Sequence, residues 1–126
     1  MDKPKKKVLV IDDEGDFLKV MRLRLEASAF EVITLDSGER AMQVAKSERP
    51  DLILLDVVMP GKNGSDVCRE LKADEATRGI PIIIFTAHYP EEEGIKTGAR
   101  WIGADDYMLK PFDSAALLVK IEALIG

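Results

Sequence analysis

The chain has few of the side chains that build metal sites and nucleophilic active sites in many enzymes. Its 126 residues include one cysteine, Cys68, and one histidine, His88. A single cysteine excludes an intrachain disulfide, and the two residues together are too few for a thiolate zinc site or a His-rich metal cluster. The lack of disulfides agrees with a reducing compartment, so we expect the protein to be cytoplasmic.

Long hydrophobic runs and an excess of positive charge are also absent. No apolar run approaches the ~18 residues of a membrane-spanning helix, and Val8–Ile11 is shorter than the apolar stretch of about 7–15 residues in a secretory signal. Acidic residues outnumber basic ones by 23 to 18, which gives a net charge of −5. Nucleic-acid-binding domains usually carry a basic excess. We therefore expect no membrane segment and no direct contact of this domain with nucleic acid.

What the chain does contain is a set of short apolar runs that alternate with helical patterns. Unbroken apolar runs are typical of strands buried on both faces of a parallel sheet. The length suits one domain, so residues 1–126 are expected to fold together. The expected strands are Val8–Ile11, Glu31–Leu35, Leu52–Leu55, Ile82–Phe85 and Asp106–Leu109, of which the second and the last are weaker.

Apolar residues at helical spacing lie between these strands. The stripes are Phe17, Met21 and Leu25; Ala41, Val44 and Ala45; Val67, Cys68 and Leu71; and Leu117, Ile121 and Leu124. Ser37 and Ser114 are expected to cap helix starts. A further helix between Ala87 and Ile102 is weakly specified, because one proline and two glycines interrupt it. Five strand–helix units predict an α/β fold, a doubly wound parallel sheet, and are too few for an eight-fold barrel.

Polar side chains follow four of the five expected strands. Asp12 and Asp13 follow the first strand, Asp56 the third, Thr86 the fourth and Lys110 the fifth. In a doubly wound sheet the carboxyl ends of the strands form the ligand site. Each residue alone has an ordinary explanation as a turn former, a helix cap or a solvated charge. The coincidence of all five at one edge of the sheet instead indicates a site.

The expected group of three carboxylates indicates a hard cation. Carboxylates at short range repel one another unless a cation lies among them. A site with oxygen ligands, few protein donors and room for water suits Mg²⁺. The sequence has no glycine-rich phosphate loop, so nucleotide binding has no support.

Four strings carry a family resemblance in their order and spacing. They are Val10-Ile11-Asp12-Asp13-Glu14, the segment Leu54 to Gly61 (LLDVVMPG), Phe85-Thr86-Ala87, and the segment Gly103 to Phe112 (GADDYMLKPF). Across essentially the whole chain, the sequence resembles a response-regulator receiver domain of two-component signalling. The resemblance implies a flavodoxin-like five-stranded sheet in strand order 2-1-3-4-5 with five helices. It also implies a signalling switch that promotes its own phosphotransfer and dephosphorylation and is not a turnover enzyme.

By this resemblance, Asp56 is the phosphoacceptor and takes a phosphoryl group from the phosphohistidine of a sensor histidine kinase or a phosphotransfer protein. Asp13, Asp56 and the backbone carbonyl of Val58 would bind Mg²⁺, with Asp12 assisting. Lys110 would pair with the phosphoryl oxygens. The physical chemistry agrees, because a carboxylate that attacks phosphorus needs cations to stabilise the developing charge.

The resemblance also implies a switch and an output surface. The Thr86 hydroxyl would hydrogen-bond to the phosphoryl group, and Tyr107 would fill the space that Thr86 vacates. Tyr107 can at the same time be an ordinary half-buried strand aromatic. The output face would comprise the helix expected between residues 87 and 102, the strand Asp106–Leu109 and the helix after it. Val58 and His88 are at positions that tune hydrolysis of the phosphoryl group, although His88 could instead face solvent.

The expected partners are a kinase or phosphotransfer protein and a downstream effector domain or protein, with a homodimer as a further option. Two alternative functions remain open. One is a small aspartyl-phosphate phosphatase or phosphotransferase, although many of these carry Asp-x-Asp, whereas Asp12 and Asp13 are adjacent and Asp56 follows another strand. The other is a non-phosphorylated interaction module, which the presence of all five functional side chains disfavours.

Overall fold

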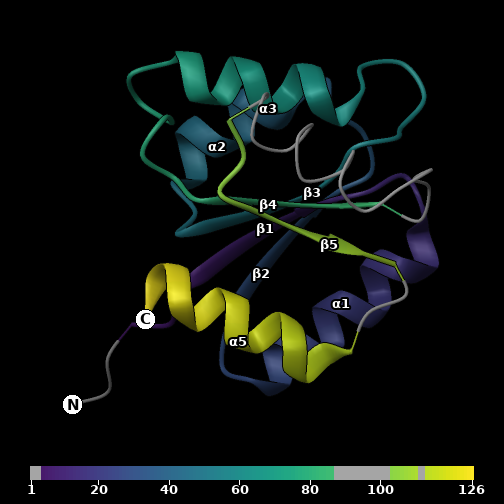
Figure 1. Ribbon diagram of the computed structural model, residues 1–126, viewed down its shortest axis with the longest axis vertical. Coiled ribbons are helices and arrows are strands. Elements are labelled where there is room, and N and C mark those ends of the chain that lie inside the picture. The colour runs from purple at the N-terminus through teal and green to yellow at the C-terminus, as the bar shows by residue number, and fades with distance from the viewer. Residues whose placement is uncertain (1–3, 87–102, 111–112) are drawn as a thin grey trace.

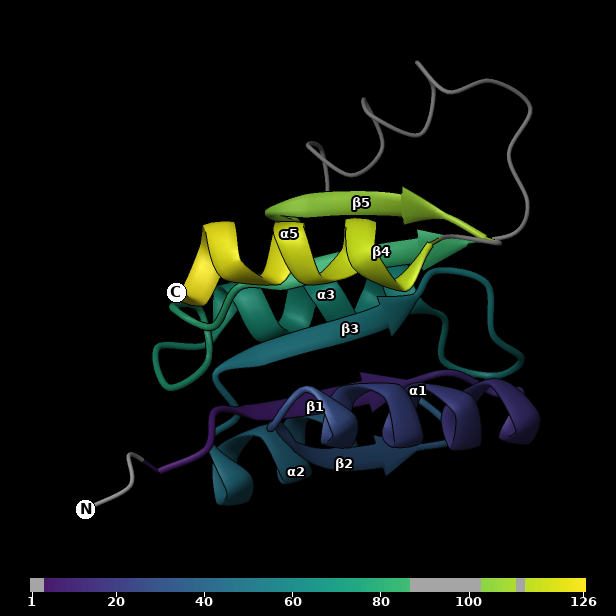
Figure 2. The same cartoon turned by 90° about the horizontal axis from the view of Figure 1, so that it is seen from below.

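The sheet has five parallel strands in the order β2-β1-β3-β4-β5. The computed structural model describes residues 4–86, 103–110 and 113–126, except the side chain of Thr86. The strands are β1 (Lys7–Ile11), β2 (Glu31–Leu35), β3 (Leu52–Asp56), β4 (Ile82–Thr86) and β5 (Asp106–Leu109). All five expected strands are confirmed, as is the expected strand order. Figure 2 shows their arrowheads at the same edge of the sheet.

Helices cover both faces of the sheet. They are α1 (Gly15–Ala27), α2 (Ala41–Glu48), α3 (Gly64–Ala73) and α5 (Ser114–Ile125). Helices α2 and α3 lie on one face, and α1 and α5 lie on the other (Figure 1). The helix expected between Ala87 and Ile102 lies outside the described residues. In the described part of the chain, no helix has the length and apolar character needed to cross a membrane.

The unbroken apolar runs are explained by two separate cores. On the α2/α3 face, Leu9 and Ile11 of β1 pack with Ile53 and Leu55 of β3. The alternate residues of the same strands, such as Val8 and Leu54, pack on the α1/α5 face. Because successive side chains of a strand point to opposite faces, a strand between two helical layers is apolar at every position.

The two expected serine caps are wrong. Helix α5 begins at Ser114, and its cap is the preceding Asp113, whose carboxylate accepts a hydrogen bond from the Ala115 N–H at 3.2 Å. The Ser114 hydroxyl instead accepts from the Arg24 guanidinium at 2.8 Å. Helix α2 begins only at Ala41, after a turn that separates it from Ser37, and its cap residue Arg40 makes no side-chain capping bond. A carboxylate one residue earlier and an intervening turn displaced the serines from the cap positions.

Candidate functional site

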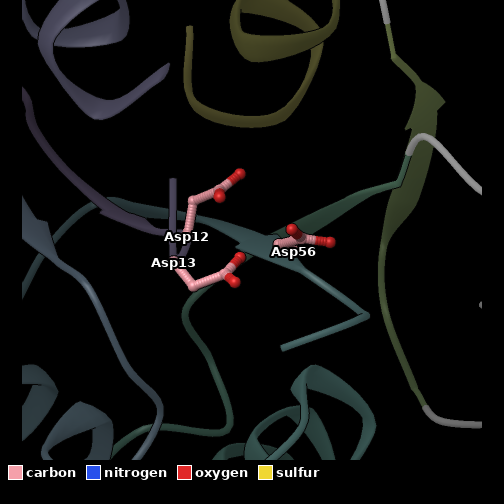
Figure 3. A group of neighbouring side chains, drawn as sticks. All are labelled: Asp12, Asp13 and Asp56. Carbon is pink, nitrogen blue, oxygen red and sulfur yellow. The ribbon is translucent and has the colours of Figure 1, made fainter. Parts of the chain in front are cut away.

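Three carboxylates meet at the carboxyl edge of the sheet, as the sequence indicated. Asp12 and Asp13 directly follow β1, and Asp56 is the last residue of the neighbouring β3. Each offers one oxygen, and these oxygens all lie within 4.8 Å of one another. Figure 3 shows the three side chains grouped at the ends of the two strands. Pairing of β1 with β3 in parallel register brings together residues that are 44 positions apart in the sequence.

The three side chains differ in burial. Asp12 is 0% exposed and Asp56 is 5% exposed, whereas Asp13 is open to solvent. One oxygen of Asp56 accepts a hydrogen bond from the Val58 N–H at 3.1 Å, and one oxygen of Asp12 accepts from the Glu14 N–H at 2.8 Å. Backbone N–H groups thus hold the two buried carboxylates in place. The third carboxylate, that of Asp13, is accessible from solvent.

Lys110 follows β5 and reaches across the edge of the sheet to these carboxylates. Its ammonium nitrogen lies 2.5 Å from Asp12 Oδ2, 3.3 Å from Glu14 Oε1 and 3.5 Å from Asp56 Oδ2. The side chain is only 9% exposed. The closest contact is therefore with Asp12, and the distance to Asp56 exceeds that of a good hydrogen bond.

The electrostatics of the site are dominated by burial. Burial raises the pKa of Asp56 to about 6, and the neighbouring charge of Asp12 adds to the rise. Burial also raises the pKa of Asp12, against the opposing effect of its hydrogen bond with Lys110. For Lys110, burial lowers the pKa, but the hydrogen bond and charge of Asp12, together with Asp56 and Glu14, outweigh it, so the net pKa is raised. One ammonium thus leaves the carboxylates with unbalanced negative charge.

This set of donors fits a magnesium ion. Magnesium prefers oxygen ligands and usually keeps several waters, so one or two carboxylates with an open side suffice. Asp13, which is exposed, and the buried Asp56 each offer one carboxylate oxygen, and Lys110 only partly balances the negative charge at Asp56 and Asp12. The carbonyl of Val58 as a further ligand stays a prediction.

The remaining expected residues are only partly described. Thr86 ends β4 and its backbone pairs with Leu109 of β5, but its side chain and the whole of His88 lie outside the described residues. Tyr107 is half-buried and packs against the core on the α2/α3 face. It lies opposite Ile84 in the β4–β5 register. Tyr107 is therefore on the strand next to the one that carries Thr86.

Sequence reasoning missed several neighbours of the site. Glu14 adds a third carboxylate to Lys110. The ring centroids of Phe17 and Phe85 lie 4.1 and 5.1 Å from the Lys110 ammonium. A Cβ at Gly64 would lie 2.0 Å from the backbone oxygen of Asp56, so only glycine allows α3 to approach the end of β3 this closely. Glu14 could have been suspected from its position after two aspartates. The roles of the other three depend on contacts that no local pattern reveals.

Comparison with known proteins gives relatives of this arrangement. Residues 8–122 match the model of the response regulator receiver domain family. The chain is 39% identical over 120 residues to the alkaline phosphatase synthesis transcriptional regulatory protein PhoP of Bacillus subtilis (strain 168), covering 95% of this chain and 48% of that protein. It thus spans about half the length of the curated relatives that it matches.

Solved structures share the fold over nearly the full chain. The chemotaxis protein CheY4 of Vibrio cholerae has a TM-score of 0.86 at 27% identity, covering 95% of this chain and 98% of that one. The BeF3-activated N-terminal receiver domain of Klebsiella pneumoniae RstA has a TM-score of 0.85 at 29% identity, with the same coverage of 95% and 98%. On its family match, its relatives and its fold, the chain belongs to the response regulator receiver domains of two-component signal transduction.

Proposed function

We propose that the domain is a signalling switch in which Asp56 accepts a phosphoryl group from the phosphohistidine of a sensor histidine kinase or a phosphotransfer protein. The observation that carries the proposal is the placement of Asp56. It ends a buried strand, lies within the group of three carboxylates and has a buried ammonium 3.5 Å from one oxygen. The membership of the chain in the receiver domain family agrees with phosphorylation-dependent signalling.

The Asp56 carboxylate is held for nucleophilic attack. The Val58 N–H restrains Oδ1 at 3.1 Å, whereas Lys110 contacts Oδ2 only at long range. Because Lys110 bonds mainly to Asp12, the charge on Asp56 is not consumed by a tight ion pair. At neutral pH, above its pKa of about 6, Asp56 is ionised and able to attack phosphorus.

Positive charge is needed around the transferring group. Magnesium bound by Asp13, Asp56 and the Val58 carbonyl, with Asp12 assisting, would offset the repulsion between the Asp56 carboxylate and an anionic phosphoryl group. Lys110 supplies a second, fixed positive charge that the phosphoryl oxygens can share. Its contacts with Asp12 and Glu14 hold the ammonium within reach of Asp56.

The switch itself would run through β4 and β5. Thr86 would hydrogen-bond to the phosphoryl group and Tyr107 would rearrange, changing the face formed by the helix expected between residues 87 and 102, β5 and α5. Adjacent pairing of β4 with β5 supports this route. Thr86→Ala and Tyr107→Ala are expected to accept phosphate but to lose its effect on amide exchange in β5 and α5. Retention of that effect in both variants would remove the relay from the proposal.

The proposal extends to hydrolysis, partners and organisation. Val58 and His88 would tune the lifetime of the aspartyl phosphate, so His88→Ala should change it. Residues 1–126 would act as a single receiver domain for an effector domain or protein, and the name of the relative PhoP, a transcriptional regulatory protein, supports such an effector. Homodimer formation on phosphorylation is tested by sedimentation with and without BeF3⁻.

The phosphoacceptor is tested by intact-mass measurement after incubation with acetyl phosphate, with and without Mg²⁺. We expect a gain of one phosphoryl group that requires Mg²⁺ and is absent in Asp56→Asn. The matched control is Asp16→Asn, which changes an exposed aspartate in the first turn of α1 outside the carboxylate group. An equal gain in Asp56→Asn, or none in the wild type, would refute the proposal. Sustained turnover of a phosphorylated metabolite would favour a phosphatase instead.

A further inference from the structure

The ammonium of Lys110 lies over two aromatic rings. The ammonium lies 4.1 Å from the ring centroid of Phe17 in α1 and 5.1 Å from that of Phe85 in β4. Both distances are within the ~6 Å at which a cation is attracted by the face of a ring. Carboxylate oxygens of Asp12, Glu14 and Asp56 lie 2.5, 3.3 and 3.5 Å from the same nitrogen.

The two rings also hold each other and the end of the sheet. Their centroids are 5.2 Å apart at an interplanar angle of 43°, a spacing typical of favourable aromatic pairs. Phe85 is 1% exposed and lies opposite Asp56 in the β3–β4 register. Its carbonyl accepts a hydrogen bond from the N–H of Val57, the residue after Asp56. The rings are therefore fixed relative to the phosphoacceptor.

We propose that Phe17 and Phe85 form an aromatic support that holds the Lys110 ammonium beside Asp56, and that both are positioning residues for phosphoryl transfer. The inference rests on the function proposed above. An aliphatic side chain could fill the same core space, but it would offer no face with negative potential to the ammonium. The support thus serves more than packing.

The aromatic support is needed because the Lys110 ammonium must move during phosphoryl transfer. Lys110 is 2.5 Å from Asp12 Oδ2 but 3.5 Å from Asp56 Oδ2, so pairing with a phosphoryl group on Asp56 requires it to shift away from Asp12. A lysine stem is flexible, and the ammonium without a partner would be free to turn toward water. Ring faces attract a cation without the strict geometry of a hydrogen bond. The support can therefore retain the ammonium throughout that shift.

Phe17 is the residue to vary, because it is half-buried whereas Phe85 is fully enclosed. The rate of phosphorylation by acetyl phosphate with Mg²⁺ is expected to fall about three- to tenfold in Phe17→Leu. A fall of this size corresponds to the loss of one partly buried cation–π contact. Phe17→Tyr keeps a ring face and should stay within about twofold of the wild type. The matched control, Phe30→Leu, removes an aromatic of the same core cluster just before β2, at the opposite edge of the sheet, and should leave the rate unchanged.

Two readouts separate this role from general damage to the core. In a Lys110→Met background, Phe17→Leu should have no further effect on the rate, because the support acts through the ammonium. In nuclear magnetic resonance spectra, the rings should shift the ε-methylene protons of Lys110 upfield. This upfield shift should be smaller in Phe17→Leu than in the wild type and should be as large as in the wild type in Phe17→Tyr.

The outcomes distinguish the support from the proposed function. A wild type that accepts phosphate while Phe17→Leu reacts at the wild-type rate overturns the support and leaves the phosphoacceptor intact. Equal effects of Phe17→Leu in the wild-type and Lys110→Met backgrounds also overturn it. A wild type that accepts no phosphate overturns the proposed function, and the ring shift of Lys110 then still decides whether the support holds the ammonium.

Discussion

At the scale of single residues, the site is defined by charges that are costly to bury. Asp12 and Asp56 are almost fully enclosed, and Lys110 contacts both with one ammonium. Burial of an incompletely paired carboxylate destabilises the folded state unless it takes up a proton or a cation. The raised pKa values of Asp56 and Asp12 express this cost. Perturbed pKa values of this kind are common at sites where a group reacts rather than stabilises the fold.

The first prediction concerns the stability of Asp56→Asn. The pKa of Asp56 is about 6 in the folded protein, above its ordinary value of 3.8. The folded state therefore binds the proton more tightly than the unfolded state does, and the resulting stability is present below pH 4 and lost as the pH rises through 6. At pH 7.5 without Mg²⁺, Asp56→Asn should be more stable by at most about 3 kcal/mol, since one pKa unit is about 1.4 kcal/mol.

This prediction is checked by urea denaturation in EDTA from pH 4.5 to pH 7.5. The gain of Asp56→Asn over the wild type should shrink toward the acid end of that range. Asp16→Asn, which changes an exposed carboxylate, should show no such dependence. A variant that is less stable than the wild type at pH 7.5 would contradict the assigned burial cost.

At the scale of elements, the site depends on how closely α3 approaches β3. The N–H of Gly64, the first residue of α3, donates to the carbonyl of Val57 at 2.9 Å, and Asn63 caps the helix through a bond from the Asp66 N–H. A Cβ at Gly64 would meet backbone atoms of Asp56 and Val57 at 2.0 and 2.7 Å. Because the atoms that this Cβ would meet belong to the backbone, no flexible side chain can move aside to make room for it.

The second prediction is that Gly64→Ala destabilises the protein by about 1–3 kcal/mol or more, as forced overpacking does. The displaced end of β3 should also slow phosphorylation of Asp56. Urea denaturation and the acetyl phosphate assay measure the two effects. Gly15→Ala is the control, because a Cβ at the start of α1 meets nothing within 4 Å. Equal behaviour of the two variants would contradict the role of close approach.

The elements also show what the sequence could and could not reveal. The strand Leu52–Leu55 was recognisable because burial on both faces makes each of these positions apolar. Asp12, Asp56 and Lys110 were recognisable because strand ends in a parallel sheet share one edge. The two predicted serine caps were wrong because Asp113 takes the cap position next to Ser114, and a turn separates Ser37 from the start of α2. Phe17 belonged to a helical apolar stripe, and its contact with Lys110 arises only when distant segments meet.

At the scale of the whole molecule, residues close to the site belong to both cores. The support residues Phe17 and Phe85 belong to the core on the α1/α5 face. Met59, three residues after Asp56, and Tyr107 belong to the core on the α2/α3 face. Under the proposed function, the phosphoryl group on Asp56 would be added at a strand end whose neighbours in the chain belong to both cores. This placement suits a domain whose family converts one covalent event into a signal.

The central claim, that Asp56 is the phosphoacceptor, is tested most directly by locating the phosphoryl group. Borohydride reduces an aspartyl phosphate to homoserine, so the protein is treated with acetyl phosphate and Mg²⁺, reduced, digested and mapped by mass spectrometry. We expect homoserine at position 56 and at no other aspartate, and only when Mg²⁺ is present. Homoserine at Asp12 or Asp13 with none at position 56 would contradict the account.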